Sequence, residues 1–258
     1  MDLSVVIPVF NGEQFILNTL TRLNEFLQKR IRSFEIIVVD DGSSDQTLDR
    51  IKSFTNQNLR VLSSPANQGK FAALVAGMAH SHGRCRVFTD SDLPYELEAI
   101  PYIVNLINER GFHVVVGDRT LRSSEYRTHL PLLRRVATRW FSRLVTVFVT
   151  GGLFDTQCGL KGLRADVADA LFPLLQDRGF SGDVELLYVA LKYNLEIKRI
   201  PVRLRGSSPS AVRVVPHALR MLLRISKLRG SWSRGLYHSE ALLRISDQSY
   251  WEVPSRGV

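Results

Sequence analysis

Short runs of apolar, mostly β-branched residues alternate with longer segments of helical periodicity along the first half of the chain. The first run, 3–9, is followed by Asn11 and Gly12 and predicts a buried strand. The next segment, 13–30, has its apolar residues at the spacing of one helix face. The same alternation predicts further strands at 35–39, 60–63, 85–89 and 113–117, and helices at 43–54, 69–82 and 94–110.

This alternation predicts an α/β fold with a mostly parallel, Rossmann-like sheet and helices on both faces. Ligands of such sheets bind beyond the carboxyl ends of the strands. Polar side chains gather at these predicted ends: Asn11, Asp40, Asp41, Asp90, Asp92 and Arg119. We therefore expect one polar site along that edge of the sheet.

The second half of the chain has a less regular pattern. It predicts helices at 130–149, 184–193 and 215–228, and a strand at 196–204. No internal repeat or low-complexity linker separates the two halves. We expect a single domain over 1–230 and a peripheral C-terminal tail over 231–258.

Composition and charge narrow the possible partners. The 258 residues are 45% hydrophobic, which excludes a disordered or fibrous chain. The net charge is +9, and the positive excess lies in 119–164 and 201–258, mostly as Arg. Such segments favour phosphate, nucleic acid or an anionic membrane, with a simple solvated surface as the alternative. No apolar run approaches the ~20 residues of a membrane span, and no secretory signal is expected. Cys85 and Cys158 indicate buried free thiols in a reducing compartment.

The sequence Asp90-Ser91-Asp92 places two carboxylates directly after a predicted strand. Carboxylate oxygens are hard ligands that suit Mg²⁺ or Mn²⁺, whose remaining positions are often taken by substrate phosphates. The same pattern is common in turns, so this motif alone is weak evidence for a metal.

Three other segments have polar residues at the predicted strand and helix ends. The residues after the strand at 35–39 could bind a base or ribose, and Ser43 or Ser44 could also cap the next helix, since the two roles are compatible. Lys70, at a helix start, could attract phosphate or simply be exposed. The polar segment 155–161 means little by itself, and we expect Cys158 to serve packing.

Together, these motifs resemble family-two glycosyltransferases of the GT-A fold. Residues 4–13 are similar to the opening strand of that family, and the match in order and spacing covers roughly 3–230. The segment 155–161, followed by Phe180 and 183–186, is similar to one branch of the family, the dolichyl- and polyprenyl-phosphate hexose synthases.

The resemblance implies a role for each matching position. The nucleotide-sugar site would comprise Pro8, Val9, Asn11, Glu13, Asp40, Asp41, Lys70, Asp90 and Ser91. Asp90 and Asp92 would hold the divalent metal, Mg²⁺ or Mn²⁺. The acceptor phosphate would be bound by Arg119, Arg134, Arg135 and Arg205. The catalytic side, around the sugar and acceptor, would comprise Asp92, Asp155, Gln157, Lys161, Asp183 and Glu185.

The chain departs from its relatives at three positions in these motifs. Ser91 replaces the usual Ala between the metal carboxylates, which should be tolerated. Pro94 stands where some relatives place a further ligand. Asp118 adds a carboxylate immediately before the expected phosphate-binding Arg119.

The implied activity is inverting transfer of a hexose from a nucleotide-diphosphate sugar to a polyprenyl or dolichyl phosphate at the membrane surface. UDP-glucose is favoured as the donor and GDP-mannose is possible. A lipid monophosphate is largely a dianion near neutral pH, so it needs orientation by Arg more than a general base. We expect a cytoplasmic protein, peripheral on the cytoplasmic face of the membrane, with basic helices over 130–149 and 219–229 on anionic lipid.

Three other functions stay open. A glycosyltransferase of the same fold could act on a soluble or polysaccharide hydroxyl acceptor, with Asp155, Asp183 or Glu185 as general base. A nucleotidyltransferase would also use paired carboxylates, but its usual Gly-rich phosphate loop is missing. A nucleic-acid-binding protein is the remote alternative, because no helix-turn-helix, RNA-recognition or zinc pattern occurs. We therefore expect no nucleic-acid partner.

Overall fold

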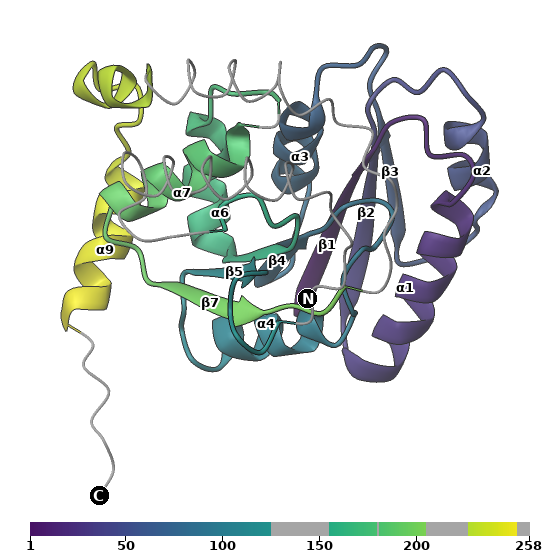
Figure 1. Cartoon of the computed structure of the whole chain (residues 1–258), viewed down its shortest axis with the longest axis horizontal. Coiled ribbons are helices and arrows are strands. Elements are labelled where there is room, and N and C mark those ends of the chain that lie inside the picture. Colours follow the sequence, from purple (N-terminus) through teal and green to yellow (C-terminus); the bar gives the residue numbers. More distant parts are fainter. Residues whose placement is uncertain (125–154, 180, 205–226, 252–258) are drawn as a thin grey trace, which may run out of the picture.

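The computed structural model describes residues 1–124, 155–179, 181–204 and 227–251. Within these residues, a seven-stranded sheet lies between two layers of helices (Figure 1). The strand order is β3-β2-β1-β4-β6-β5-β7. This arrangement confirms the predicted α/β fold.

The strands are short and mostly buried. They are β1 (Leu3–Val9), β2 (Phe34–Asp40), β3 (Leu59–Ser63), β4 (Cys85–Phe88), β5 (Val114–Asp118), β6 (Lys161–Arg164) and β7 (Ile197–Pro201). Six of these were predicted within a few residues, whereas β6 was not. It is also the only antiparallel strand among those described, and it pairs with β4 on one side and β5 on the other.

The helices follow the predicted alternation and add elements in the second half. They are α1 (Ile16–Arg30), α2 (Thr47–Ser53), α3 (Lys70–Ala79), α4 (Ala99–Asn108), α6 (Ala165–Leu171), the 3₁₀ turn η2 (Phe172–Leu174), α7 (Gly182–Lys192) and α9 (Glu240–Trp251). The expectation that Ser43 or Ser44 caps the second helix is wrong. That helix begins at Thr47, and Gln46 precedes it without a side-chain capping bond.

The parallel pairing brings three strand ends to one edge. In β1 and β2, Val9 pairs with Asp40, and in β1 and β4, Val6 pairs with Phe88. The loops after β1, β2 and β4 therefore leave the sheet side by side. Lys161 pairs with Phe88 across the antiparallel β6, so the segment before β6 reaches the same edge from the opposite direction.

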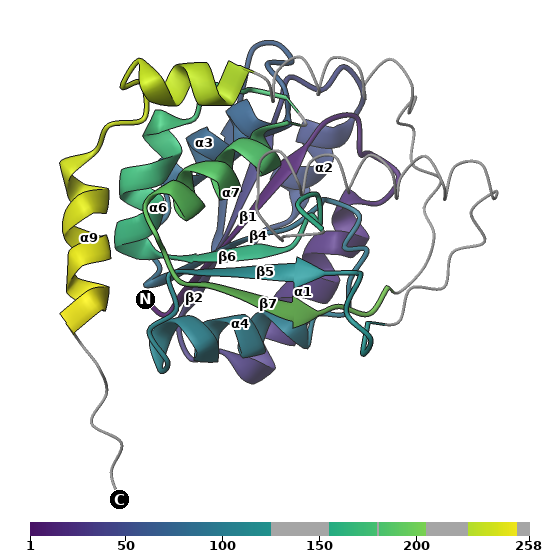
Figure 2. The same cartoon turned by 60° about the vertical axis from the view of Figure 1, so that its left-hand side comes forward.

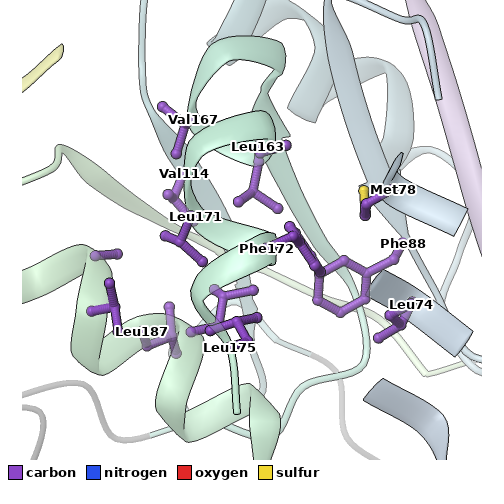
Figure 3. Close-up of a cluster of buried hydrophobic side chains, with 14 of the residues drawn as sticks. Leu74, Met78, Phe88, Val114, Leu163, Val167, Leu171, Phe172, Leu175 and Leu187 are labelled. Atoms are coloured by element: carbon purple, nitrogen blue, oxygen red, sulfur yellow. The ribbon is translucent and has the colours of Figure 1, made fainter. Parts of the chain in front are cut away.

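Alternating side chains of the sheet form two cores, one on each face. The first packs beneath α3, α6 and α7, and Figure 3 shows Phe88 and Leu163 pointing into it towards Phe172. The rings of Phe88 and Phe172 meet edge to face with centroids 6.3 Å apart. The second core packs beneath α1, α2 and α4.

Two glycines allow the helices to approach the sheet closely. A Cβ on Gly77 of α3 would lie 2.3 Å from a methyl group of Val6 in β1. A Cβ on Gly162 of β6 would lie 2.2 Å from a methyl group of Ile103 in α4. Both distances are too short for any larger residue, so these positions fix how α3 and α4 lie against the strands.

The C-terminal residues also pack on the first core. Residues 227–233 are helical and α9 lies against α6 (Figure 2). Tyr237, Leu242 and Ile245 are buried in the same cluster as α6 and α7. They lie beyond residue 230, and the division of the chain at that residue stays a prediction.

Two of the predicted helices cannot be compared. The segments 130–149 and 215–226 lie outside the described residues. Among the helices that the structure does describe, none has the length and apolar character that crossing a membrane requires.

Candidate active site

Asp90 forms the centre of the polar edge, and Lys70 binds it. Lys70 is the first residue of α3, and its Nζ lies 2.6 Å from Oδ1 of Asp90, just beyond β4. Both side chains are partly buried, with exposed fractions of 17% for Lys70 and 34% for Asp90. The helix start and the strand end are thus joined by one ion pair.

The surrounding charges set the ionisation of this pair. Burial opposes the charged form of Asp90, but Lys70, Lys161 and Arg119 outweigh it and hold the pKa of Asp90 below its ordinary value. Burial likewise opposes the charged form of Lys70, yet Asp90 and Asp183 raise the pKa of Lys70 above its ordinary value. Both groups are therefore ionised at neutral pH.

The segment 155–161, whose sequence alone predicted no function, contacts the Asp90 side chain through Gly159. A Cβ built on Gly159 would lie only 1.9 Å from Oδ2 of Asp90 and 2.5 Å from its Cγ. The carboxylate therefore rests directly on the Gly159 backbone, and only glycine leaves room for it there. Sequence reasoning did not single out Gly159.

Arg119 and Asp155 form a second ion pair at the end of β5. The Nε and Nη2 atoms of Arg119 each lie 2.7 Å from an oxygen of Asp155, and the Arg119 backbone N–H donates to the same carboxylate at 2.8 Å. Burial opposes the charged form of each group, but their pairing prevails. It raises the pKa of Arg119 and lowers the pKa of Asp155. This fork-to-carboxylate geometry fixes the direction of the guanidinium.

Lys161 and Asp183 form a third pair, deep in the structure. Lys161 has no exposed surface, and its Nζ donates to Oδ1 of Asp183 at 2.5 Å and to the Cys158 carbonyl at 2.6 Å. The same ammonium lies 5.5 Å from the centre of the Phe88 ring. Lys161 thus ties the turn beneath Asp90 to the first turn of α7.

Glu185 lies two residues further along α7 and is also buried. Its carboxylate accepts hydrogen bonds from the backbone N–H groups of Gln176 and Asp177 and from the hydroxyl of Tyr237. Glu185 therefore organises the loop before α7. The contact with Tyr237 joins residues 52 positions apart, and no sequence pattern announces it.

The loops after β1 and β2 hold each other by reciprocal bonds. The Asn11 backbone N–H donates to the Ser43 hydroxyl, and the Asn11 side-chain carbonyl accepts from the Ser44 N–H, both at 2.9 Å. The Glu13 carboxylate accepts from the Gln46 N–H at 2.9 Å. Asn11 adopts a positive φ of 51°, a conformation in which Asn is one of the more tolerated residues. These expected nucleotide-site residues thus shape the loops at the edge.

Asp40 is the last residue of β2, Asp41 follows it, and both are buried. Asp40 accepts from the Ser63 hydroxyl of β3 at 3.2 Å, and Asp41 accepts from the backbone N–H groups of Gln68 and Gly69 at 2.9 Å each. Asp41 therefore fixes the chain just before Lys70. A hollow of about 250 Å³ adjoins Asp41 and Gln68 on the β3 side.

The remaining expected donor-site residues line the same strand ends. Pro8 and Val9 are buried at the end of β1, and Ser91 accepts the Thr19 hydroxyl through its carbonyl at 2.7 Å. Phe10, which sequence reasoning missed, is 47% exposed between Val9 and Asn11. An exposed ring at a strand end offers a surface on which a base can stack.

The donor atoms fit a divalent ion of the Mg²⁺ type. Asp90 offers an ionised carboxylate, and Asp92, two residues on, is partly exposed. In the described part of the chain, no three His, Cys, Asp or Glu side chains come together as a complete metal cage. The pair therefore suits an ion that takes its other ligands from water and substrate phosphates.

The structure brings most of the expected catalytic residues together. Lys161, which is paired with Asp183, and Arg119, which is paired with Asp155, both act electrostatically on Asp90. Gln157 is exposed on the same segment as Gly159. Arg134, Arg135 and Arg205 lie outside the described residues.

Two observations concern groups whose function was uncertain. Asp118, the extra carboxylate before Arg119, is buried and bound by Nε of Arg199 in β7 at 2.6 Å, so it serves the sheet. Cys85 and Cys158 are both free and buried, as predicted. Burial raises the pKa of Cys158 to about 11, which keeps its thiol protonated at neutral pH.

Residues 4–172 match the model of glycosyl transferase family 2. The chain belongs to this family. It is 29% identical to the dolichyl-phosphate beta-glucosyltransferase of Dictyostelium discoideum, over 91% of this chain and 76% of that protein. It is 27% identical to the human dolichyl-phosphate beta-glucosyltransferase, over 90% of this chain and 77% of that protein.

Solved structures of the same fold support the architecture. Glucosyl-3-phosphoglycerate synthase from Mycobacterium tuberculosis, in complex with Mn²⁺, UDP-glucose and phosphoglyceric acid, superposes with a TM-score of 0.66 at 20% identity. The match covers 89% of this chain and 80% of that one. The same enzyme with Mg²⁺ and UDP superposes with a TM-score of 0.63. The family-two chain therefore has the expected GT-A fold.

Proposed function

We propose that this family-two glycosyltransferase transfers a hexose, with glucose as the first candidate, from a nucleotide-diphosphate sugar to a polyprenyl or dolichyl phosphate. The chain is similar to dolichyl-phosphate beta-glucosyltransferases over most of its length. The observation that carries the proposal is the state of Asp155, Asp183 and Glu185, because a hydroxyl acceptor would need one of them as a general base.

Each of these three carboxylates is already engaged by strong donors. Asp155 holds both nitrogens of the Arg119 fork, and Asp183 is bound by the fully buried Lys161. Glu185 accepts two backbone N–H groups and a hydroxyl. A carboxylate bound in this way is a poor proton acceptor. The arrangement therefore suits a nucleophile that arrives without a proton to lose, such as a phosphate dianion.

The donor would bind at the ends of β1, β2 and β4. Asp90 and Asp92 would hold Mg²⁺ or Mn²⁺, which supplies positive charge to the diphosphate leaving group. Lys70 supplies a second positive charge at the N-terminus of α3, where the helix dipole also favours negative charge. Phe10 offers its exposed ring to the base.

The acceptor phosphate would bind beside Arg119. Asp155 fixes the direction of this guanidinium, and part of the Arg119 side chain, 30%, is exposed. Arg134, Arg135 and Arg205 would add charge from their own segments. A phosphate oxygen placed behind the anomeric carbon displaces the nucleotide diphosphate in one step and inverts the configuration. The protein's part is therefore orientation and charge stabilisation.

A lipid acceptor implies work at a membrane surface. We propose that the protein is peripheral on the cytoplasmic face, held by the Arg-rich segments 119–164 and 201–258, each with a net charge of +7. Each basic residue close to an anionic leaflet contributes about 1 kcal/mol. Flotation with anionic liposomes at low salt, lost at high salt, is the expected result, and no flotation at low salt would contradict this attachment.

The test of the activity uses purified protein, Mn²⁺, a panel of radiolabelled nucleotide sugars and polyprenyl phosphate. Organic extraction should recover label from one donor, and Asp92→Ala should abolish the transfer. Release of nucleotide diphosphate from one donor without any lipid label would keep the donor site and contradict the lipid acceptor.

A further inference from the structure

The C-terminal segment is fixed against α7 by a buried tyrosine. Tyr237 is 2% exposed, and its hydroxyl donates to Oε1 of Glu185 at 2.5 Å. The Tyr237 carbonyl accepts from the hydroxyl of Tyr193 at 2.7 Å, and that same hydroxyl accepts from the Ser239 N–H at 2.8 Å. The position of Tyr237 is therefore determined on both its backbone and its side chain.

Glu185 carries this contact to the loop before α7. Oε1 accepts from the N–H of Gln176 at 3.0 Å, and Oε2 accepts from the N–H of Asp177 at 2.8 Å. The Asp177 carboxylate then accepts from the Gly179 N–H at 2.7 Å and from the Ser181 hydroxyl at 2.6 Å. The loop is thus held at both ends by carboxylates.

The same loop holds the start of α3. The Arg178 carbonyl accepts from the N–H groups of Phe71 at 3.0 Å and Ala72 at 3.3 Å. These amides belong to the first turn of the helix, where no carbonyl of the helix itself can reach them. Lys70, the neighbouring residue, carries the ammonium that binds Asp90.

A glycine makes this contact possible. Gly69 has a φ of +103°, and a Cβ there would lie 2.4 Å from the Arg178 carbonyl oxygen. The loop backbone therefore lies directly against the first residues of α3. From the other side, a Cβ on Gly182 would lie 2.2 Å from the Phe71 ring. Because the loop and the helix start are in direct contact, we expect a shift of the loop to move the helix start.

We propose that Tyr237 and Glu185 are positioning residues of the donor site, which hold Lys70 against Asp90 through the loop that contains Arg178. Removing the Tyr237 hydroxyl leaves a buried carboxylate with one strong donor fewer, and its remaining bonds to the loop must rearrange. The consequence for catalysis rests on the proposed function. The contact with α3 does not depend on it.

The test is Tyr237→Phe, read in two ways. Hydrogen exchange of the unliganded protein should show the amides of Phe71 and Ala72 exchanging about tenfold faster, the effect expected for a lost bond to a charged group. The dissociation constant of UDP with Mn²⁺, measured by calorimetry, should rise by a similar factor. Glu185→Gln should give the same two changes and replaces the first variant if that one does not fold.

A matched control removes one buried methylene group from the other core. Ile100→Val, in α4, should lower stability without changing the exchange of Phe71 and Ala72 or the binding of UDP. Faster exchange at Gln176 and Asp177 alone, with Phe71 and Ala72 unchanged, would overturn the proposal. A wild-type protein that binds UDP but labels no lipid would instead contradict the proposed function and leave this inference standing.

Discussion

At the scale of single residues, the position of the Asp90 carboxylate depends on the absence of a side chain at Gly159. The Asp90 carboxylate lies on Gly159, where any Cβ would overlap it. We expect Gly159→Ala to push the carboxylate away from Lys70 and to weaken Mn²⁺-dependent binding of UDP at least about tenfold, the loss of one charge-assisted contact. Calorimetric titration measures this change.

Gly230→Ala is the control for this substitution, because an added Cβ at Gly230 meets no atom within 4 Å. It should leave UDP binding unchanged. Equal binding by the wild type and the Gly159→Ala variant would show that the close contact with Gly159 does not position Asp90.

The buried pair of Lys161 and Asp183 makes a prediction about stability. Lys161→Met leaves the Asp183 carboxylate buried without its ammonium partner, which should cost about 3–5 kcal/mol in the free energy of unfolding. Urea denaturation measures it. The double variant Lys161→Met with Asp183→Leu should recover most of the loss, because a buried pair is replaceable by apolar residues. A single variant as stable as the wild type would contradict a structural role for the pair.

At the scale of helices and strands, the sequence pattern predicted most of the sheet. Buried parallel strands such as β1 and β2 are continuous apolar runs, and their ends correctly located the polar edge. The strand β6 was missed because its sequence, Lys-Gly-Leu-Arg, has one large apolar residue. Its burial is possible because Lys161 forms an ion pair with Asp183 and because Gly162 has no side chain to overlap Ile103.

The sequence predicted which residues lie at the candidate site better than it predicted the contacts between them. Asp90 and Lys70 were both expected near the donor, but nothing in the sequence pattern joins them. Ser43 and Ser44 illustrate the limit, because they bind Asn11 of a neighbouring loop rather than their own helix. Tyr237 could not be predicted at all, since its partner is far away along the chain.

A buried histidine at the start of the β5–β7 pairing predicts how the stability of the fold depends on pH. His113, just before β5, is buried, and its Nδ1 accepts from the Glu196 N–H at 3.0 Å. Burial and the charge of Arg164 lower the pKa of His113 to about 4, although Asp166 acts in the opposite direction. The unfolded chain therefore binds a proton between about pH 6.5 and 4 that the folded chain does not.

The free energy of unfolding should consequently fall as the pH drops through that window, by about 3 kcal/mol at most. The fall should be largely absent in His113→Asn, whose side-chain carbonyl can still accept the Glu196 bond. Urea denaturation at several pH values measures both proteins. The same slope between pH 6.5 and 4 in both proteins would contradict the role of His113.

At the scale of the whole molecule, cationic and anionic side chains with different roles lie along one edge of the sheet. Asp90 and Asp92 are suited to a metal and a diphosphate, and Lys70 and Arg119 supply positive charge near Asp90. The carboxylates that could serve as general bases are all bound by other groups. The proposed reaction therefore requires an acceptor that needs no base.

The most direct measurement compares two acceptors that differ only in the phosphate. Purified protein, Mn²⁺ and one labelled nucleotide sugar are incubated with polyprenyl phosphate or with the corresponding polyprenol, and the lipid label is counted. We expect label on polyprenyl phosphate and none on the alcohol. Comparable label on the alcohol would contradict the proposed reaction, because transfer to a hydroxyl requires the general base that Asp155, Asp183 and Glu185 are not placed to provide.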